Sequence, residues 1–232
     1  MAAKKKLITP KTIVQLLIVI VVIPLMPMII SGVWNWWEAW VYALLHILGF
    51  IASRVLASRR HPDILEERAA SMGMQDAKSW DKKLAPLMAL GPLLTLIVIG
   101  FDKQQAWTTP FAFNAKIAAL IVMVLGYAFG TWALMENKFF SGVVRIQTDR
   151  GHHVVTTGPY RIMRHPGYAG ALWMYLATPI LMDSLWAFIP TVLLLVVTVI
   201  RTSLEDRTLQ EELPGYKEFT NQTRYRLIPG IW

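Results

Sequence analysis

The sequence predicts an all-α integral membrane protein, a polytopic helical bundle of about six membrane segments. Hydrophobic residues make up 55% of the 232-residue chain and charged residues only 16%, a balance typical of a membrane protein. The apolar residues fall into about six runs, joined by connections that alternate between strongly basic and almost uncharged stretches. The chain is too short to add a soluble catalytic domain of the usual ~100–150 residues, so any active site must be built from the spans and their connections.

Four of the expected spans lie in an N-terminal membrane region, residues 1–135. The first run has no small-residue cleavage site and is followed by further spans, so we predict a retained anchor and not a secretory signal. In the fourth run, Gly126 and Gly130 form a GxxxG pattern, which predicts close helix packing. Each run is near the ~20 residues needed to cross a bilayer. The runs cover residues 13–30, 39–56, 84–100 and 114–134.

The connection between the second and third runs, residues 58–83, is expected to lie at the membrane interface. It contains the sequence ILEERAA after a proline. We expect Ile64, Leu65 and Arg68 to share one face of a short interfacial helix. This helix is predicted to anchor the bundle at the membrane surface.

The C-terminal region, residues 136–232, is expected to hold the functional site. Two shorter apolar runs, at 168–182 and 185–200, are separated by Asp183 and Ser184. We therefore predict a tight helical hairpin that enters and leaves the membrane. The region divides into a connector, the hairpin and a polar tail, at residues 136–166, 167–201 and 202–232.

The positive charge is distributed as a topology signal. The formal net charge is +8, but the basic residues gather in alternate connections and not on one face, so we predict no nucleic-acid partner. The positive-inside rule places the basic connections and both termini in the cytoplasm. We expect a cytoplasmic cofactor pocket where the connector meets the C-terminal tail.

Several kinds of site are excluded by the sequence. The chain has no cysteine, which removes disulfides, cysteine-ligated zinc and a thiol nucleophile. It has no GxG triplet and no Walker A pattern, which argues against a Rossmann-type nucleotide site. The histidines form no HExxH motif and no carboxylate–histidine spacing typical of zinc, so no metal is predicted. The histidines are His46, His61, His152, His153 and His165.

An ordered series of polar and aromatic residues in the C-terminal region is the most informative pattern. The basic stretch GPYRIMRHPGYAG, residues 158–170, lies between apolar runs, where charge is costly unless it is used. The sequence HHVV at 152–155 precedes it, and Glu205-Asp206, Leu209 and Tyr216 follow. The series resembles the isoprenylcysteine carboxyl methyltransferase family and related membrane phospholipid methyltransferases. The family motifs H-x-[LV]-[VI]-T-x-G-x-Y, R-H-P-x-Y-x-G and E-[ED]-x-x-L occur here in order, and Tyr216 follows them.

The resemblance covers roughly residues 137–232 and implies an S-adenosylmethionine-dependent methyltransferase, with S-adenosylhomocysteine as the product. It implies a cofactor pocket outside the Rossmann class. Gln147 joins the cofactor set although its spacing to His152 is shorter than the family's usual one. The catalytic roles carried over fall on Arg164, Arg201, Glu205 and His165. The cofactor-binding residues carried over are Gln147, His152, His153, Val154, Val155, Tyr160, His165, Pro166, Gly167, Tyr168 and Glu205.

The chemistry of these side chains agrees with such a cofactor. S-Adenosylmethionine carries an amino group, a carboxylate, a sulfonium and an adenine, so its site needs a carboxylate, a cation, apolar walls and aromatic surface. Glu205 can bind the ammonium or the ribose, and Arg164 with His165 can meet the carboxylate. Tyr160 and Tyr168 can flank the adenine or the sulfonium.

The expected reaction is direct in-line transfer of the sulfonium methyl to an amphiphilic or lipid-like acceptor at the bilayer. An isoprenylcysteine carboxylate is the first choice, since a carboxylate arrives ionised and needs only a cation such as Arg201 or Arg164. A phospholipid amine or a small thiol stays open as the acceptor and would need a base, for which His165 and Glu205 are candidates. No obligatory protein partner is inferred, and we predict a prokaryotic inner membrane.

Three other function classes are weighed against this one. A sterol-type membrane reductase would use NADPH, and the histidine-first motif argues against it. A transporter would need polar residues along a path through the spans, but apart from His46 the span interiors are almost free of ionisable groups. A scaffold would have no reason to gather Arg164, His165, Arg201 and Glu205.

Overall fold

The computed structural model describes residue 14, residues 17–71 and residues 76–232, and these parts of the chain contain helices and irregular segments without a strand. The predicted all-α class is confirmed. Four helices are long and apolar enough to cross a membrane, in agreement with the expected runs 39–56, 84–100, 114–134 and 185–200. They are α3 (Trp37–Arg60), α5 (Asp81–Gln105), α6 (Phe113–Glu136) and α8 (Phe188–Glu212).

The other helices are shorter. The first expected run begins outside the described residues, and its described part forms η1 and then α2, which ends at Gly32 in the left-handed conformation. Gly32 is the usual residue for such a helix end, because glycine has no Cβ to clash. The remaining elements are η1 (Ile18–Val22), α2 (Ile23–Ser31), α4 (Ile64–Ser71), η2 (Thr148–Arg150), η3 (Gly158–Arg161), α7 (Pro166–Leu181) and α9 (Tyr216–Gln222).

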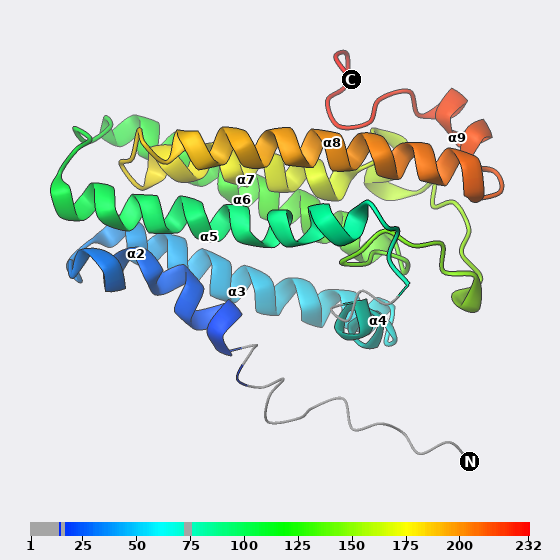
Figure 1. The fold of residues 1–232 in the computed structure, drawn as a ribbon, viewed down its shortest axis with the longest axis horizontal. Helices are drawn as coiled ribbons and strands as arrows, with labels where there is room; N and C mark the ends of the chain where they lie inside the picture. The colour runs from blue at the N-terminus through cyan, green and yellow to red at the C-terminus, as the bar shows by residue number, and fades with distance from the viewer. Residues whose placement is uncertain (1–13, 15–16, 72–75) are drawn as a thin grey trace.

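The long helices run side by side along the long axis of the molecule (Figure 1). Helix α5 contacts both α2 and α8, and α7 packs on α6 and on α8. Helices α4 and α9, the irregular segment 137–157 and the C-terminus gather at one end of this bundle (Figure 1). The connector and the tail, which are remote in sequence from each other, therefore meet at the same end of the long helices.

The closest helix contact joins α6 and α7, and small residues make it possible. A Cβ added to Gly170 would lie 2.6 Å from the carbonyl oxygen of Gly126 and 2.9 Å from the amide nitrogen of Gly130. No real side chain fits at such distances, so the two backbones approach as the GxxxG pattern predicts. This contact places the first turn of α7 next to the C-terminal half of α6.

The turn between α7 and α8 is held at the opposite end of the bundle by a buried ion network. Lys116 of α6 donates from Nζ to Glu38 Oε1 of α3 at 2.6 Å and to Asp183 Oδ2 in the turn. Asp183 has a φ of +54°, a left-handed conformation that suits a tight turn and that aspartate tolerates better than most residues. The predicted Asp183-Ser184 turn is confirmed. Its position fixes how α7 and α8 are aligned along each other.

One expectation about the helices needs correction. Ile64 is fully buried against Ala57 and Leu134, whereas Leu65 is 42% exposed, so Leu65 does not share the face of Ile64, because consecutive helical residues are about 100° apart. Arg68, one turn after Ile64, does lie on the bundle side and donates from Nη1 to the Phe140 carbonyl at 3.4 Å. Helix α8 runs to Glu212, so it extends into the C-terminal tail, residues 202–232.

Candidate active site

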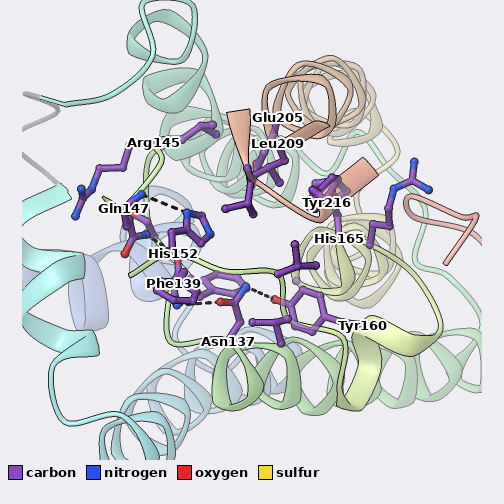
Figure 2. Close-up of a pocket in the computed structure, with 18 of the residues that line it drawn as sticks. Asn137, Phe139, Arg145, Gln147, His152, Tyr160, His165, Glu205, Leu209 and Tyr216 are labelled. Atoms are coloured by element: carbon purple, nitrogen blue, oxygen red, sulfur yellow. Dashed lines mark hydrogen bonds between the residues drawn. The ribbon is translucent and has the colours of Figure 1, made fainter. Parts of the chain in front are cut away.

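A pocket opens at the end of the bundle where four segments meet. It lies between the connector, the first turn of α7, the C-terminal half of α8 and the start of α9. Figure 2 shows side chains from these segments facing one another across a common space, with connector residues on one side and α8 and α9 residues on the other. The labelled residues are Asn137, Phe139, Arg145, Gln147, His152, Tyr160, His165, Glu205, Leu209 and Tyr216.

The connector has almost no regular structure, so side chains hold its shape. Asn137 Oδ1 accepts a hydrogen bond from the Phe139 amide at 2.9 Å, and Asn137 Nδ2 donates to Tyr160 Oη at 3.1 Å. Gln147 is 1% exposed and donates from Nε2 to the Phe139 carbonyl at 2.7 Å. Burial raises the pKa of Tyr160, so its phenol stays neutral. These bonds fix one wall of the pocket.

Two ion pairs fasten the connector to α4 and to the residue that precedes it, Asp63. Arg145 Nη2 lies 2.8 Å from Glu67 Oε2, and Arg150 Nη2 lies 2.5 Å from Asp63 Oδ2. The hydrogen bonds that Arg145 donates to Glu67 and then to Asp149 raise the pKa of Arg145. Helix α4 therefore supports the outer side of the connector, and Arg145 lines the pocket while remaining paired.

His152 faces the pocket as a neutral ring. Its Nδ1 accepts a hydrogen bond from the Gln147 amide at 3.2 Å, and its ring lies 4.4 Å from the Phe139 ring, centroid to centroid. Burial, with further contributions from His153, Arg145 and Arg150, lowers the pKa of His152 to about 4. Because an acceptor nitrogen cannot carry a proton, the hydrogen bond and the pKa agree on the protonation state.

This protonation state predicts a pH dependence. His152 has an ordinary pKa of 6.5 and a folded value of about 4, so the unfolded chain binds the extra proton between these values. Its contribution to stability is therefore complete above pH 6.5 and is lost as the pH falls through 4. We expect the melting temperature of the purified protein to fall over this range more steeply than that of His152→Gln. His153→Gln, an exposed neighbour, is the matched control and should follow the wild type, and equal pH profiles for wild type and His152→Gln would contradict the assignment.

Asp206 on α8 is the centre of a buried network. The residue is 0% exposed, and its Oδ1 accepts from Arg164 Nε at 2.7 Å and from Tyr216 Oη at 3.1 Å. Oδ1 also lies 3.2 Å from His165 Nε2, and Oδ2 accepts from Arg226 Nε at 2.8 Å. One carboxylate thus joins α8, the turn before α7, α9 and the C-terminal segment.

Arg164 is committed to this network. Besides its two bonds to Asp206, its Nη1 donates to the carbonyl oxygens of Thr223 and Arg224 at 2.8 and 2.6 Å. Burial alone would lower the pKa of Arg164, but the charge and hydrogen bonds of Asp206 outweigh burial and raise it. Four of its five N–H donors are occupied within the protein, which leaves little of the guanidinium for the ligand carboxylate that the sequence assigned to it.

Arg201, Tyr168 and Glu205 form a second network on the α7–α8 side of the pocket. Arg201 makes a paired contact with Asp81 of α5, with Nε–Oδ1 and Nη2–Oδ2 distances of 2.7 and 3.0 Å. Arg201 Nη1 also donates to the Tyr168 hydroxyl, which donates to Glu205 Oε2 at 2.6 Å. Arg201 and Glu205 are four residues apart on α8 and share a face of that helix, but the tyrosine hydroxyl lies between them. Within the described residues Glu205 Oε1 has no protein partner.

The structure brings together all but one of the residues singled out in the sequence. Pro166 does not line the pocket and instead begins α7 as its first residue, a position that suits its fixed φ. Gly167 does line it, and a Cβ there would lie 2.5 Å from the Phe140 ring. The predicted residues that line the pocket are Gln147, His152, His153, Val154, Val155, Tyr160, Arg164, His165, Gly167, Tyr168, Arg201 and Glu205.

Sequence reasoning missed the residues that support this set. Asp81 is the first residue of α5 and lies 120 residues before Arg201. The only sequence feature that could have indicated it is an acidic residue just before an apolar run. Asp206 was visible beside Glu205 in the motif but had no role assigned. Asn137 and Phe139 carry no local signal, because their roles arise only when the connector folds.

The chemical character of the lining fits S-adenosylmethionine. Glu205 offers a free carboxylate oxygen, Phe139 and Tyr160 offer aromatic surface, and Val154 and Val155 offer apolar wall. The enclosed space measures about 110 Å³, below the roughly 300–1,000 Å³ of small-molecule pockets. No group of three or more potential metal ligands occurs within the parts of the chain that the structure describes.

Comparison with known proteins gives consistent results. Residues 114–214 match the family model described as phospholipid methyltransferase. A probable protein-S-isoprenylcysteine O-methyltransferase from Oryza sativa subsp. indica is 24% identical over 146 residues, which is 62% of this chain and 71% of the relative. Protein-S-isoprenylcysteine O-methyltransferase A from Arabidopsis thaliana is 31% identical over 102 residues, 43% of this chain and 48% of the relative. The match spans α6, the connector, α7 and α8.

Proposed function

We propose that this chain, whose residues 114–214 match the phospholipid methyltransferase family, is a methyltransferase that transfers a methyl group from S-adenosylmethionine to an amphiphilic carboxylate. One observation carries the proposal: the motif residues come from four separate segments and line the same pocket. The Glu205 carboxylate oxygen that has no protein partner among the described residues faces this pocket. The names of the plant relatives support an O-methyltransferase.

We propose that Glu205 holds the donor's ammonium group and that the connector supplies the walls. When bound, S-adenosylmethionine supplies an electrophilic methyl group on a sulfonium. Tyr168 fixes the position of the Glu205 carboxylate through its hydroxyl, and Arg201 in turn fixes Tyr168. Phe139 and Tyr160 offer faces to an adenine or a sulfonium. Arg164 acts as a positioning residue, because Asp206 and two carbonyls occupy it.

The state of the candidate bases favours a carboxylate acceptor. The Nε2 atom of His165 lies 3.2 Å from Asp206 and 3.5 Å from the Tyr216 hydroxyl, and Glu205 accepts from Tyr168. His165 Nε2 is therefore engaged within the protein, and the free Oε1 of Glu205 is the atom that we assign to the donor's ammonium group, so neither residue is proposed as a base. An ionised carboxylate needs no base, and the field of Arg201 at the pocket would attract it. An isoprenylcysteine carboxylate is the acceptor that these arguments support first.

We further propose six membrane segments, the four long helices together with α7 and the segment ending in α2. The N-terminal membrane region is residues 1–135 and the catalytic region residues 136–232. The basic connections support a cytoplasmic position for the pocket and for both termini, and the membrane that we propose is a prokaryotic inner membrane. A pocket at this face can receive a head group from water and an apolar tail from the bilayer.

The test is methyl transfer by the detergent-purified protein with labelled S-adenosylmethionine. We expect label in an S-prenylated N-acetylcysteine and none in its methyl ester, which lacks the carboxylate and is the matched control. Label in phosphatidylethanolamine or in a small thiol, without label in the acid, would overturn the carboxylate assignment. Binding of NADPH in place of S-adenosylhomocysteine would overturn the donor assignment in favour of a reductase.

A further inference from the structure

A second cavity lies inside the bundle, away from the candidate active site. It measures about 470 Å³, within the roughly 300–1,000 Å³ range of small-molecule sites. Its lining comes from η1, α2, α3, α5, α6, α7 and α8, and it shares no lining residue with the first pocket. Occupation of this cavity is therefore a question separate from the proposed methyl transfer.

One face of α3 forms the length of this cavity. Tyr42, His46, Phe50 and Arg54 all line it, and they follow one another at intervals of four residues. Residues spaced in this way lie on the same side of a helix, and twelve residues correspond to about 18 Å along the axis. The cavity is thus elongated, with Arg54 near the connector end of α3 and Tyr42 near the other end.

Arg54 is a cation without an anion. Its guanidinium lies 4.6 Å from the Phe50 ring centroid, and it makes no ion pair or hydrogen bond with any residue in the described parts of the chain. Every acidic residue of the sequence lies in those parts. An ionisable group within a membrane span is costly unless it is paired or used. An anionic group of a ligand would supply the missing partner.

The far end of the cavity has its own unsatisfied group. Thr191 lines the cavity and is 1% exposed, and its Oγ1 has no hydrogen-bond partner among the described residues. Thr191 lies in the first turn of α8, at the end of the bundle opposite the connector. A buried hydroxyl without a partner is destabilising, and a hydroxyl or carbonyl group on a ligand would supply the missing hydrogen bond.

We propose that this cavity binds a single-chain amphiphile that carries an acidic group at one end and a hydrogen-bonding group at the other. The acidic group pairs with Arg54, the apolar chain lies along Phe50 and the apolar residues of α2 and α5, and the distal polar group bonds to Thr191 Oγ1. The two polar ends select the ligand class: a hydrocarbon chain alone leaves both unsatisfied, and a simple fatty acid leaves Thr191 unsatisfied.

The test uses a diazirine-bearing palmitate, cross-linked by light to the protein in nanodiscs and displaced by unlabelled competitors. We expect 16-hydroxyhexadecanoate to compete more strongly than palmitate, and palmitate at least about tenfold more strongly than hexadecanol, since a charge-assisted hydrogen bond contributes about 1.5–3 kcal/mol. Cross-linked peptides should come from α3 and α8. Equal competition by palmitate and hexadecanol would overturn the proposal.

Two variants test the two ends separately. Arg54→Gln should abolish the preference for palmitate over hexadecanol, and Arg54→Lys should retain it. Thr191→Val, which removes the hydroxyl at almost constant volume, should abolish only the advantage of the hydroxy acid. Arg59→Gln, an exposed arginine on the same helix, is the control and should leave all preferences unchanged. Retention of both preferences in Arg54→Gln and Thr191→Val would overturn the site.

The two proposals can fail independently. Binding of S-adenosylhomocysteine, measured by calorimetry on the same preparations, reports on the first pocket alone. We expect Arg54→Gln and Thr191→Val to keep the wild-type affinity for S-adenosylhomocysteine. Normal S-adenosylhomocysteine binding without competition by amphiphiles would leave the methyltransferase proposal standing and reject this one.

Discussion

Replacing Glu205 by glutamine should weaken S-adenosylhomocysteine binding by about 10- to 150-fold and reduce methyl transfer at least as much. The estimate follows from the loss of one charge-assisted hydrogen bond, about 1.5–3 kcal/mol, with about 1.4 kcal/mol for each factor of ten. The substitution keeps the shape of the side chain and the acceptor oxygen that faces the Tyr168 hydroxyl. It removes the negative charge that an ammonium group requires, so the fold should be preserved while donor affinity falls.

Glu211→Gln is the matched control for this variant. Glu211 lies on the same helix, is exposed and pairs with Arg207 one turn away, so its neutralisation changes the net charge equally without touching the pocket. We expect wild-type donor affinity for Glu211→Gln in the same calorimetric titration. Wild-type affinity in Glu205→Gln would remove Glu205 from the donor site and would require another anchor for the ammonium group.

Replacing Asp206 by asparagine should destabilise the C-terminal part of the protein by about 3–5 kcal/mol, the usual cost of breaking a buried ion pair. Asparagine turns an amide N–H toward donors that need an acceptor, and it leaves Arg164 buried without its counter-charge. Because Asp206 also bonds to Tyr216 and Arg226, α9 and the C-terminal segment should detach. We expect cleavage of the chain after α8 at protease concentrations that leave the wild type intact, together with a lower melting temperature.

The control here is Asp149→Asn. Asp149 pairs with Arg145 at the surface, and its side chain is 60% exposed, so its loss should change stability by less than about 1 kcal/mol. The structural role of Asp206 would be contradicted if the Asp206→Asn variant resisted protease like the wild type but failed to transfer methyl groups. It would assign Asp206, and Arg164 with it, to the chemistry of the pocket.

The sequence was sufficient for features that depend on local pattern. Hydropathy located α3, α5, α6 and α8, because a span needs a long apolar run whatever its neighbours are. The GxxxG pattern predicted the close approach of α6, which the structure completes with Gly170 of α7. The order of the motifs identified twelve of the residues that line the first pocket, together with Pro166, which does not line it.

Tertiary structure alone decided how these residues are used. Arg201 and Asp81 are 120 residues apart, and Arg164 and Asp206 are 42 residues apart, so no local pattern could pair them. The sequence therefore assigned both arginines to ligands, whereas folding gives each a buried carboxylate. The interior cavity is likewise invisible in the sequence. That Arg54 has no anionic partner and Thr191 Oγ1 no hydrogen bond among the described residues is recognised only once the neighbouring helices are in place. Hydropathy and motifs indicate the chemistry that each side chain offers. Tertiary packing determines which other side chain or ligand it contacts.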